Sequence, residues 1–381
     1  MTDAAYLRSA RAVRERCRQV YELGLAGKLP CFTVHPERLV AVADLVAQVT
    51  RAAYPDLAIP IHGRFRHFDA PGLALLQAGL AQLSPAEKAR AQVDLVVVSV
   101  LLDAGSGPGW RYVDETGRTW ARSEGLAVAS LRMFLAGAFS SDPAQPLRAD
   151  AAGLAALDEA ALGRGFQVGA DNPLAGVAGR LALLHGVGRA LPRPGALVDR
   201  LGGAPEVPGA ALLSLLLETL GGIWPGRITL DGVPLGDVWP CEALGGLVPF
   251  HKLSQWLAYS LVEPLASAGI TVTRLDDLTG LPEYRNGGLF LDLGALRPTD
   301  PQLGARPLAA SSEPVVEWRA LTVALLDELA PLVRTQLGVD AERLPLACVL
   351  EGGSWAAGRV LAGRLRDGRA PLSVASDGTV F

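Results

Sequence analysis

Charged side chains are scarce in this chain of 381 residues, since Asp, Glu, Lys and Arg together make up 19% of it. Ordinary globular domains carry roughly 25%, and disordered or coiled-coil chains carry more. The low charge therefore excludes both of those classes. Basic residues are not in surplus either, because the formal net charge is −4. We therefore expect neither nucleic acid nor an anionic membrane surface as a partner.

Long apolar runs and paired cysteines are also missing. No segment reaches the roughly 18 uncharged apolar residues of a membrane-spanning helix, and the N-terminus lacks the apolar stretch of a signal peptide. The four cysteines form no C-x-x-C pair and lie far apart, at Cys17, Cys31, Cys241 and Cys348. This usage suits a reducing compartment and argues against a zinc cluster. We expect a cytoplasmic protein.

The familiar cofactor and hydrolase motifs are absent as well. The chain contains no P-loop, no G-x-G-x-x-G after a strand, no H-E-x-x-H and no G-x-S-x-G elbow. Its five histidines include no pair spaced i, i+4 for zinc. The sequence therefore predicts no metal ion and no cofactor.

Apolar residues recur at helical spacing along most of the chain. Helices are predicted at residues 3–24, 36–53, 71–83, 85–102, 126–139, 151–162, 174–190, 210–223, 250–265 and 318–333. Ser84 and Pro85 mark the start of one of them as a capping box with proline at the first helical position. Prolines are expected to disturb the helix at Pro264 and to end another early at Pro331.

Strands are few. We predict hairpins at residues 110–121 and Arg227–Trp239, the second with Asp231-Gly232 as its turn. Residues 59–68 are predicted as a loop or brief strand, and Gly288–Leu293 as a strand. Because strands do not alternate with helices, we expect a mainly α fold with small β-hairpins (α+β). We expect one globular unit over residues 1–381, with a seam near the Pro- and Gly-rich stretch 192–210 between an N-terminal helical half and a C-terminal half.

The segment His62–Phe68 concentrates arginine, histidine and aromatic residues. In an extended backbone Arg64 and Arg66 point to one face, and His67 to the other. Two guanidinium groups on one face suit a phosphate or a carboxylate. The alternative is a pair of solvated or ion-paired arginines beside packed rings.

A second polar segment begins at Pro249. On a helix, its polar face consists of Lys252, Gln255, Tyr259 and Glu263. Tyr and Gln beside Lys are unusual on a solvent-facing surface, so this face can line a pocket. We count the neighbouring His251 among the binding candidates. The alternative is a half-buried helix whose polar groups bind their neighbours.

Two further segments carry polar groups. Residues 281–292 place Glu283, Tyr284 and Arg285 in a turn that enters the predicted strand, with Asp292 as a reserve carboxylate. Loops on rigid elements often hold catalytic groups; otherwise Arg285 pairs with a carboxylate and Asn-Gly simply forms the turn. The glycine-rich segment Glu351–Arg359 is predicted to pack close to backbone or to cap a helix.

Several long strings in this order resemble the uracil catabolism protein 4 family over nearly the whole chain. They are HGRFRHF, VVVSVLLDAGSGPGWRY, RSEGLAVASL, PFHKLSQWLAYSLVEPL, LTGLPEYRNGG, VEWRALTVALLDELAPLVR, LEGGSWAAGR and SDGTVF. The resemblance implies a role in a pyrimidine-degrading route. That route makes uridine monophosphate, opens the ring with a cyclohydrolase-like enzyme, and ends in urea and a three-carbon acid.

A fainter resemblance covers residues 250–288. The order Phe-x-Lys, x-Gln-x-Leu and Leu-Thr-x-x-x-x-Tyr-Arg is similar to the queuosine nucleotide N-glycohydrolases of the queuine salvage family. It implies a helical fold related to DNA glycosylases. It also implies a catalytic carboxylate before Tyr-Arg, where this chain has Glu283 in place of aspartate, and a nearby lysine, here Lys252.

Together these features predict an N-ribosidic hydrolase that releases urea from ribosylurea or its phosphate. Glu283 would stabilise the cationic anomeric carbon and activate water, and Lys252 would hold or protonate the leaving group. The 5-phosphate would bind Arg64 and Arg66. Two alternatives remain: a hydrolase or lyase acting on a C–N bond of the opened ring, and a non-catalytic partner of the cyclohydrolase-like enzyme.

Overall fold

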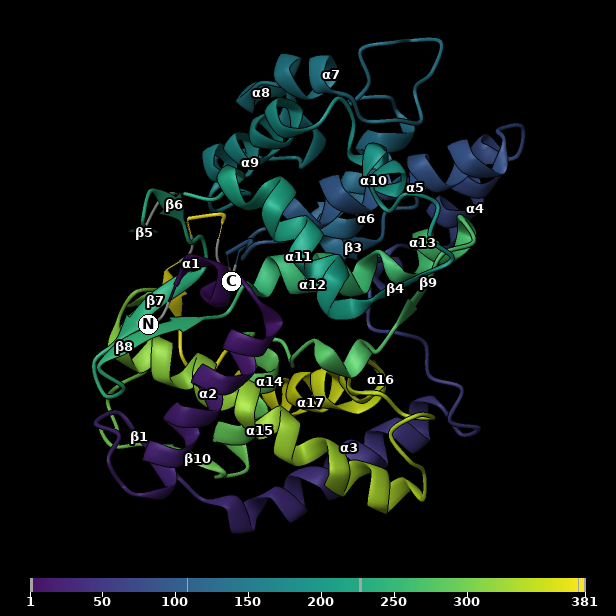
Figure 1. Ribbon diagram of the computed structural model, residues 1–381. Coiled ribbons are helices and arrows are strands. Elements are labelled where there is room, and N and C mark those ends of the chain that lie inside the picture. The colour runs from purple at the N-terminus through teal and green to yellow at the C-terminus, as the bar shows by residue number, and fades with distance from the viewer. Residues whose placement is uncertain (1–2, 108, 226–227, 376, 380–381) are drawn as a thin grey trace. The chain divides into compact units, whose positions relative to one another are not determined.

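The computed structural model of this protein describes residues 3–107, 109–225, 228–375 and 377–379. Within these ranges the chain is mainly helical and every sheet has two strands, which confirms the predicted mainly α architecture with small hairpins (Figure 1). The chain divides into two compact units. Unit 1 comprises Met1–His62, Arg227–Gln255 and Arg274–Ala375; unit 2 comprises Gly63–Gly226, Trp256–Thr273 and Ser376–Phe381. Residues 192–210 lie wholly inside unit 2.

Unit 1 is built on helices from both ends of the chain. Its helices are α1 (Ala4–Leu7), α2 (Ala10–Leu25), α3 (Leu39–Ala53), α14 (Tyr284–Asp292), α15 (Glu313–Leu337), α16 (Leu346–Val349) and α17 (Trp355–Arg366), with a π-helical turn at Leu350–Ser354. Its strands are β1 (Phe32–Val34), β5 (Thr229–Leu230), β6 (Val233–Pro234), β7 (Val238–Cys241), β8 (Gly246–Pro249), β10 (Leu296–Pro298), β11 (Leu308–Ala309) and β12 (Val374–Ala375). Pairs β5–β6 and β7–β8 are hairpins, β1–β10 is a long-range antiparallel pair, and β11–β12 is parallel.

Helix α15 is the centre of unit 1. It packs against α2 and α3, which come from the other end of the sequence (Figure 1). The predicted apolar stripe is buried at Trp318, Leu321, Leu325 and Leu329. The proline effect predicted at Pro331 is wrong, because the helix continues to Leu337. Pro331 lies on the exposed face, where water can solvate the carbonyl group that loses its partner.

A buried ion pair connects α15 to the second polar segment. Arg319 donates from both terminal nitrogens to Asp237, at 2.8 Å each, and its side chain is 1% exposed. Asp237 also accepts the backbone N–H of Lys252 at 3.0 Å and the indole N–H of Trp239 at 2.6 Å. Burial alone would raise the pKa of Asp237, but the charge and hydrogen bonds of Arg319 hold it well below the ordinary value.

The strand predicted at Gly288–Leu293 is wrong, because these residues belong to α14. Glu283 caps this helix by accepting the backbone N–H groups of Arg285 and Asn286. The glycines reflect close helix packing rather than a turn. A Cβ atom at Gly287 would lie 2.6 Å from the indole nitrogen of Trp318 on α15, so a larger residue would push the two helices apart.

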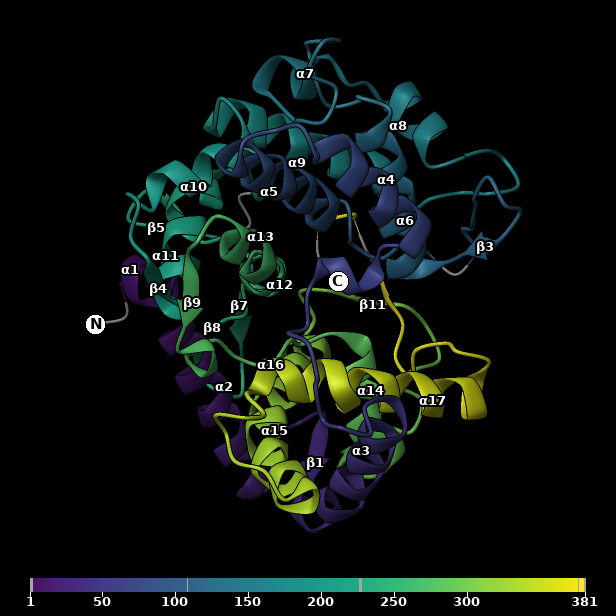
Figure 2. The same ribbon diagram turned by 90° about the vertical axis from the view of Figure 1, so that its right-hand side faces the viewer.

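Unit 2 surrounds a buried helix, α5 (Pro85–Leu101), which packs against α6 (Arg122–Leu135), α9 (Val177–Ala190) and α13 (Val262–Ser267) (Figure 2). Its other helices are α4 (Ala70–Leu80), α7 (Ala151–Ala156), α8 (Glu159–Gly165), α10 (Leu197–Arg200), α11 (Gly209–Leu220) and the part of α12 (Lys252–Ser260) from Trp256. Its strands are β2 (Tyr112–Val113) and β3 (Thr119–Trp120), an antiparallel hairpin, with β4 (Glu206–Pro208) and β9 (Thr271–Thr273), a parallel pair.

Several predicted boundaries are met and others shift. Ser84 accepts the N–H of Glu87 and starts α5 as expected, and the hairpin within 110–121 is confirmed. The second hairpin forms at β5–β6, although Arg227 lies outside the described residues. The helix predicted over 151–162 is two helices, because Asp158 caps α8. The helix predicted over 250–265 is divided at Leu261, before Pro264.

The loop or strand predicted at residues 59–68 is partly wrong, because Arg64–His67 forms a 3₁₀ helix. Successive residues of such a helix turn by about 120°. Arg64 and Arg66 therefore do not share a face, as they would in an extended strand. The side chain of Arg64 is completely buried, whereas that of Arg66 is 32% exposed.

The Asp237–Arg319 pair predicts a large loss of stability on truncation. Arg319→Met leaves the Asp237 carboxylate without its cation, and breaking a buried pair typically costs about 3–5 kcal/mol. Arg11→Met is the control, because the Arg11–Glu15 pair is exposed and such pairs contribute about 0–1 kcal/mol. Urea unfolding followed by circular dichroism measures both variants. Equal unfolding midpoints for the two variants would show that the stability of the protein does not depend on the Asp237–Arg319 pair.

A second prediction concerns Glu317, whose side chain on α15 is completely buried. Its Oε2 accepts the N–H of Cys31 at 3.2 Å, and burial raises its pKa from 4.5 to about 7. The Glu317 carboxyl group therefore binds its proton more tightly in the folded protein than in the unfolded chain. This difference adds fully to the free energy of unfolding below pH 4.5, and the added stability is lost as the pH rises to about 7.

Glu317→Gln should accordingly gain stability relative to the parent protein across that pH window. The gain is at most about 1.4 kcal/mol per pH unit, and it should level off above the window. Thermal midpoints of both proteins, measured at intervals from pH 4 to 8, test this. A difference between the midpoints that does not change with pH contradicts the prediction.

Candidate functional site

Glu283 is held rigidly at the start of α14. Its Oε1 accepts the backbone N–H of Asn286 at 2.8 Å, and its Oε2 accepts that of Arg285 at 3.0 Å. The residue is half-buried. Because a carboxylate oxygen has two lone pairs, each oxygen can accept a further hydrogen bond. The helix cap therefore fixes the carboxylate and leaves it able to act on a ligand.

Aromatic and guanidinium groups continue this site along unit 1. Arg285 is 3% exposed and donates to the Tyr284 hydroxyl at 3.0 Å, and its guanidinium lies 4.1 Å from the ring centroid of Trp355. Helix α17 approaches α14 closely enough for this stacking because of Gly358, where a Cβ atom would lie 2.2 Å from the Arg285 carbonyl oxygen. Tyr284 and Trp355 thus contact a buried guanidinium two residues along the chain from Glu283.

A histidine–carboxylate pair adjoins Trp355. His62 Nδ1 lies 2.5 Å from Glu351 Oε2, and the two side chains are 5% and 14% exposed. The His62 ring is 6.1 Å from that of Trp355. Glu351 lies in the π-helical turn, which packs on α3 because Gly353 has no Cβ to meet Thr50. π-Helical turns are frequent at functional sites.

Sequence reasoning did not select His62, Glu351 or Trp355, although two of the polar segments contain them. The signal that could have indicated them was His62 at the start of the string HGRFRHF and Glu351 in the string LEGGSWAAGR. A third link joins the same elements, because Ser354 donates to the Asn286 side chain at 3.0 Å. The described part of unit 1 thus brings residues 62, 283–286 and 351–355 together.

The second polar segment holds the loop that precedes Glu283 through hydrogen bonds of Gln255. Gln255 is fully buried, and its amide donates to Phe250 and Thr279 and accepts from the Thr279 N–H. This exchange connects the start of α12 to the loop that leads to Glu283. His251 donates from Nε2 to the Leu7 carbonyl at 2.8 Å, and burial lowers the pKa of His251. Lys252 is half-buried at the first position of α12.

The reserve carboxylate, Asp292, lies at the other end of α14 from Glu283. Nine helical residues separate their ends by about 13 Å along the axis. Asp292 forms a two-pronged pair with Arg366, at 2.7 Å for each contact. The two carboxylates therefore cannot act on the same atom.

The remaining predicted residues belong to unit 2. Arg64 lies 2.8 Å from Asp103 Oδ2 and 3.4 Å from His67 Nδ1. Burial lowers the pKa of Arg64, while the charge of Asp103 acts in the opposite direction. Arg66 instead pairs with Glu263 at 2.7 Å on the surface. Tyr259 is buried in α12.

The chain matches, over residues 6–381, the family described as "Protein of unknown function (DUF1688)". It belongs to this family. It is 41% identical over 394 residues to Protein urg3 of Schizosaccharomyces pombe, covering 99% of this chain and 98% of the relative. It is 37% identical over 438 residues to Uracil catabolism protein 4 of Lachancea kluyveri, with the same coverage. The whole-chain resemblance predicted from the sequence strings is confirmed.

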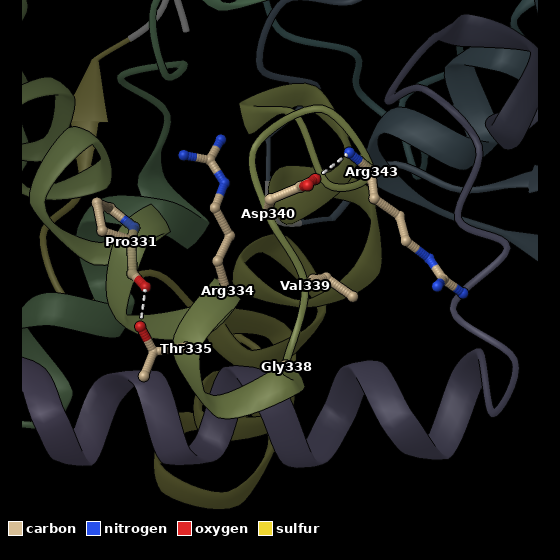
Figure 3. A pocket seen from close by; sticks show the side chains of 7 residues that line it. All are labelled: Pro331, Arg334, Thr335, Gly338, Val339, Asp340 and Arg343. Carbon is tan, nitrogen blue, oxygen red and sulfur yellow. Dashed lines mark hydrogen bonds between the residues drawn. The ribbon is translucent and has the colours of Figure 1, made fainter.

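A surface hollow of about 630 Å³ lies elsewhere in unit 1 of this DUF1688 protein, at the C-terminal end of α15 (Figure 3). It is lined by Pro331, Arg334, Thr335, Gly338, Val339, Asp340 and Arg343. None of the predicted site residues reaches it. Arg334 already donates to the Leu344 carbonyl at 2.8 Å and to Asp276 at 3.0 Å, so the hollow offers little free binding chemistry there.

Among the described residues, no group of three or more His, Cys, Asp or Glu side chains could hold a metal ion. Over the same ranges, no helix is both long enough and apolar enough to cross a bilayer.

The close approach of α17 to α14 gives a matched pair of variants. Gly358→Ala should move Arg285 away from Trp355 and lower the thermal midpoint, because the added methyl group meets the Arg285 carbonyl. Gly363→Ala on the same helix meets nothing within 4 Å and should stabilise by up to about 1 kcal/mol through helix propensity. Calorimetry compares them. If both substitutions have the same effect, the contact is not restrictive.

Proposed function

We propose that this protein acts in uracil catabolism as an N-ribosidic hydrolase that releases urea from ribosylurea or its 5-phosphate. The name of the Lachancea kluyveri relative, Uracil catabolism protein 4, supports the pathway. The observation that carries the reaction is the Glu283 carboxylate, held by two backbone N–H groups. Arg285, which donates one of them, also contacts Tyr284 and Trp355.

The chemistry needs a fixed negative charge at one point. When the bond between the anomeric carbon and nitrogen breaks, its electron pair leaves with the urea nitrogen and the sugar carbon becomes cationic. Glu283 stabilises that cation and accepts a proton from the attacking water, whose oxygen bonds to the carbon. The leaving nitrogen takes up a proton, for which Lys252 is the proposed donor. The products are urea and the free sugar or its phosphate.

The other predicted site residues take different places in this proposal. The predicted phosphate-binding residues Arg64 and Arg66 lie in unit 2, and each is paired with a carboxylate, that of Asp103 or Glu263, so we assign neither of them to the 5-phosphate. Asp292 would act only if Glu283 does not, and its pair with Arg366 opposes that role. Tyr284 and Arg285 would hold the planar part of the substrate by stacking and hydrogen bonds.

Release of free urea from synthetic ribosylurea and ribosylurea 5-phosphate by the purified protein tests the activity. Urea and ribose in equal amounts support the proposal. Ammonia or a shortened ureide instead of urea would favour a C–N hydrolase or lyase of the opened ring. No turnover of either substrate would favour a non-catalytic partner.

Glu283→Gln should lower kcat by about 10²–10³ with little change in KM. The negative charge contributes mainly when the carbon becomes cationic, and one aimed electrostatic group typically accounts for that factor. Steady-state kinetics of urea release measures the effect.

The capping role of Glu283 needs its own control. Glu283→Ser keeps a good helix cap but removes the carboxylate, so it should fold like the parent protein and still lose turnover. Glu283→Asp keeps both functions and should retain more activity than either. If Glu283→Ser is fully active while Asp292→Asn is inactive, the wrong carboxylate has been assigned.

A further inference from the structure

Asp103 in unit 2 has one oxygen fully engaged and one unused. Its Oδ2 accepts from Ser123 Oγ at 2.8 Å and from the Trp256 indole N–H at 3.2 Å, and lies 2.8 Å from Arg64 Nη1. Its Oδ1 accepts no hydrogen bond from any residue of the described ranges. The side chain is 8% exposed, so solvent reaches it. A carboxylate held this way offers one acceptor in a fixed direction.

The partner guanidinium has an unused donor. Arg64 donates from Nε to Ser99 at 2.7 Å and from Nη1 to Ser123. Its Nη2 is buried and has no hydrogen-bond acceptor in the described structure. A buried donor left unsatisfied costs about 1–3 kcal/mol, and more when it is charged. A ligand that supplies an acceptor there recovers that cost.

The backbone that carries Asp103 is also fixed. Arg180 is completely buried and donates to the carbonyl groups of Leu102, Ala104 and Gly105. These bonds hold the backbone immediately before and after Asp103. The acceptor and the donor are therefore arranged before any ligand arrives, which lowers the entropic cost of binding.

We infer that Asp103 and Arg64 form a binding site for a neutral ureido group, with the ligand N–H donating to Asp103 Oδ1 and its carbonyl accepting from Arg64 Nη2. The two side chains compensate each other's charge, so the site favours a neutral ligand over an anion. Carboxylate and guanidinium are both planar, and a ureide presents its N–H and C=O side by side in one plane. The rings of Trp256 and His67, 5.5 Å apart, border the Oδ2 side.

This binding goes beyond the proposed hydrolysis and does not require it. A binding measurement without turnover therefore separates the ureide-binding site from the proposed hydrolase. If the protein binds a ureide but releases no urea, the hydrolase proposal fails and the binding site stands.

Saturation-transfer NMR with N-methylurea tests the site in the full-length protein. We expect a signal from the parent protein and a loss of affinity of at least tenfold in Asp103→Asn. The Asn carbonyl oxygen should take the Oδ2 position, where three donors converge, which places its NH₂ donor where Oδ1 was the acceptor. Asp199→Asn, in the exposed Arg90 pair of the same unit, should bind like the parent.

Ligand controls keep the test decisive if Asp103→Asn does not fold. Tetramethylurea has the carbonyl but no N–H and should give no signal. D-Ribose and orthophosphate should not compete with N-methylurea. The inference is overturned if the parent protein does not bind N-methylurea, if tetramethylurea binds equally well, if a folded Asp103→Asn protein keeps its affinity, or if ribose or phosphate displaces the ureide.

Discussion

The Asp237–Arg319 pair is the interaction on which the organisation of unit 1 depends. Arg319 lies in the buried N-terminal part of helix α15, and Asp237 directly precedes β7 of the β7–β8 hairpin. The same carboxylate accepts the Lys252 N–H, which fixes the first turn of α12. From there Gln255 holds Thr279, four residues before Glu283. One buried ion pair thus positions, through successive hydrogen bonds, the loop that carries the proposed catalytic carboxylate.

The low charge of the chain makes such pairs prominent. Charged residues are few, yet several are buried: Asp94 is completely buried and pairs with Arg193 in unit 2, and Arg64 is buried against Asp103. Replacing a buried pair with apolar residues often costs nothing in stability. Their value here lies in orientation, since each fixes a segment that an apolar contact would leave free to slide. Arg64 Nη2 and Asp103 Oδ1 have no hydrogen-bond partner in the described structure, and they are the two atoms to which we assign the ureide.

Local signals in the sequence predicted local structure well. Ser84-Pro85 starts α5, and Asp231-Gly232 turns the β5–β6 hairpin, because the determining contacts lie within a few residues. Signals that depend on distant residues were misread. Gly287 suggested a turn because Trp318, which requires a glycine there, lies on another helix. Arg64 and Arg66 suggested one phosphate-binding face because their partners, Asp103 and Glu263, come later in the chain.

The path of the chain explains why the polar segments divide their roles. The boundary between the units falls between His62 and Gly63, and again between Gln255 and Trp256. Each boundary lies inside a polar segment, so one string supplies His62 to unit 1 and Arg64 to unit 2. The other string supplies Gln255 to unit 1 and Trp256 to unit 2. A short motif can therefore serve two sets of contacts, and a residue's neighbour in sequence is a poor guide to its chemical partner. For this reason the two proposed sites, around Glu283 and around Asp103, are best tested by separate variants with separate readouts.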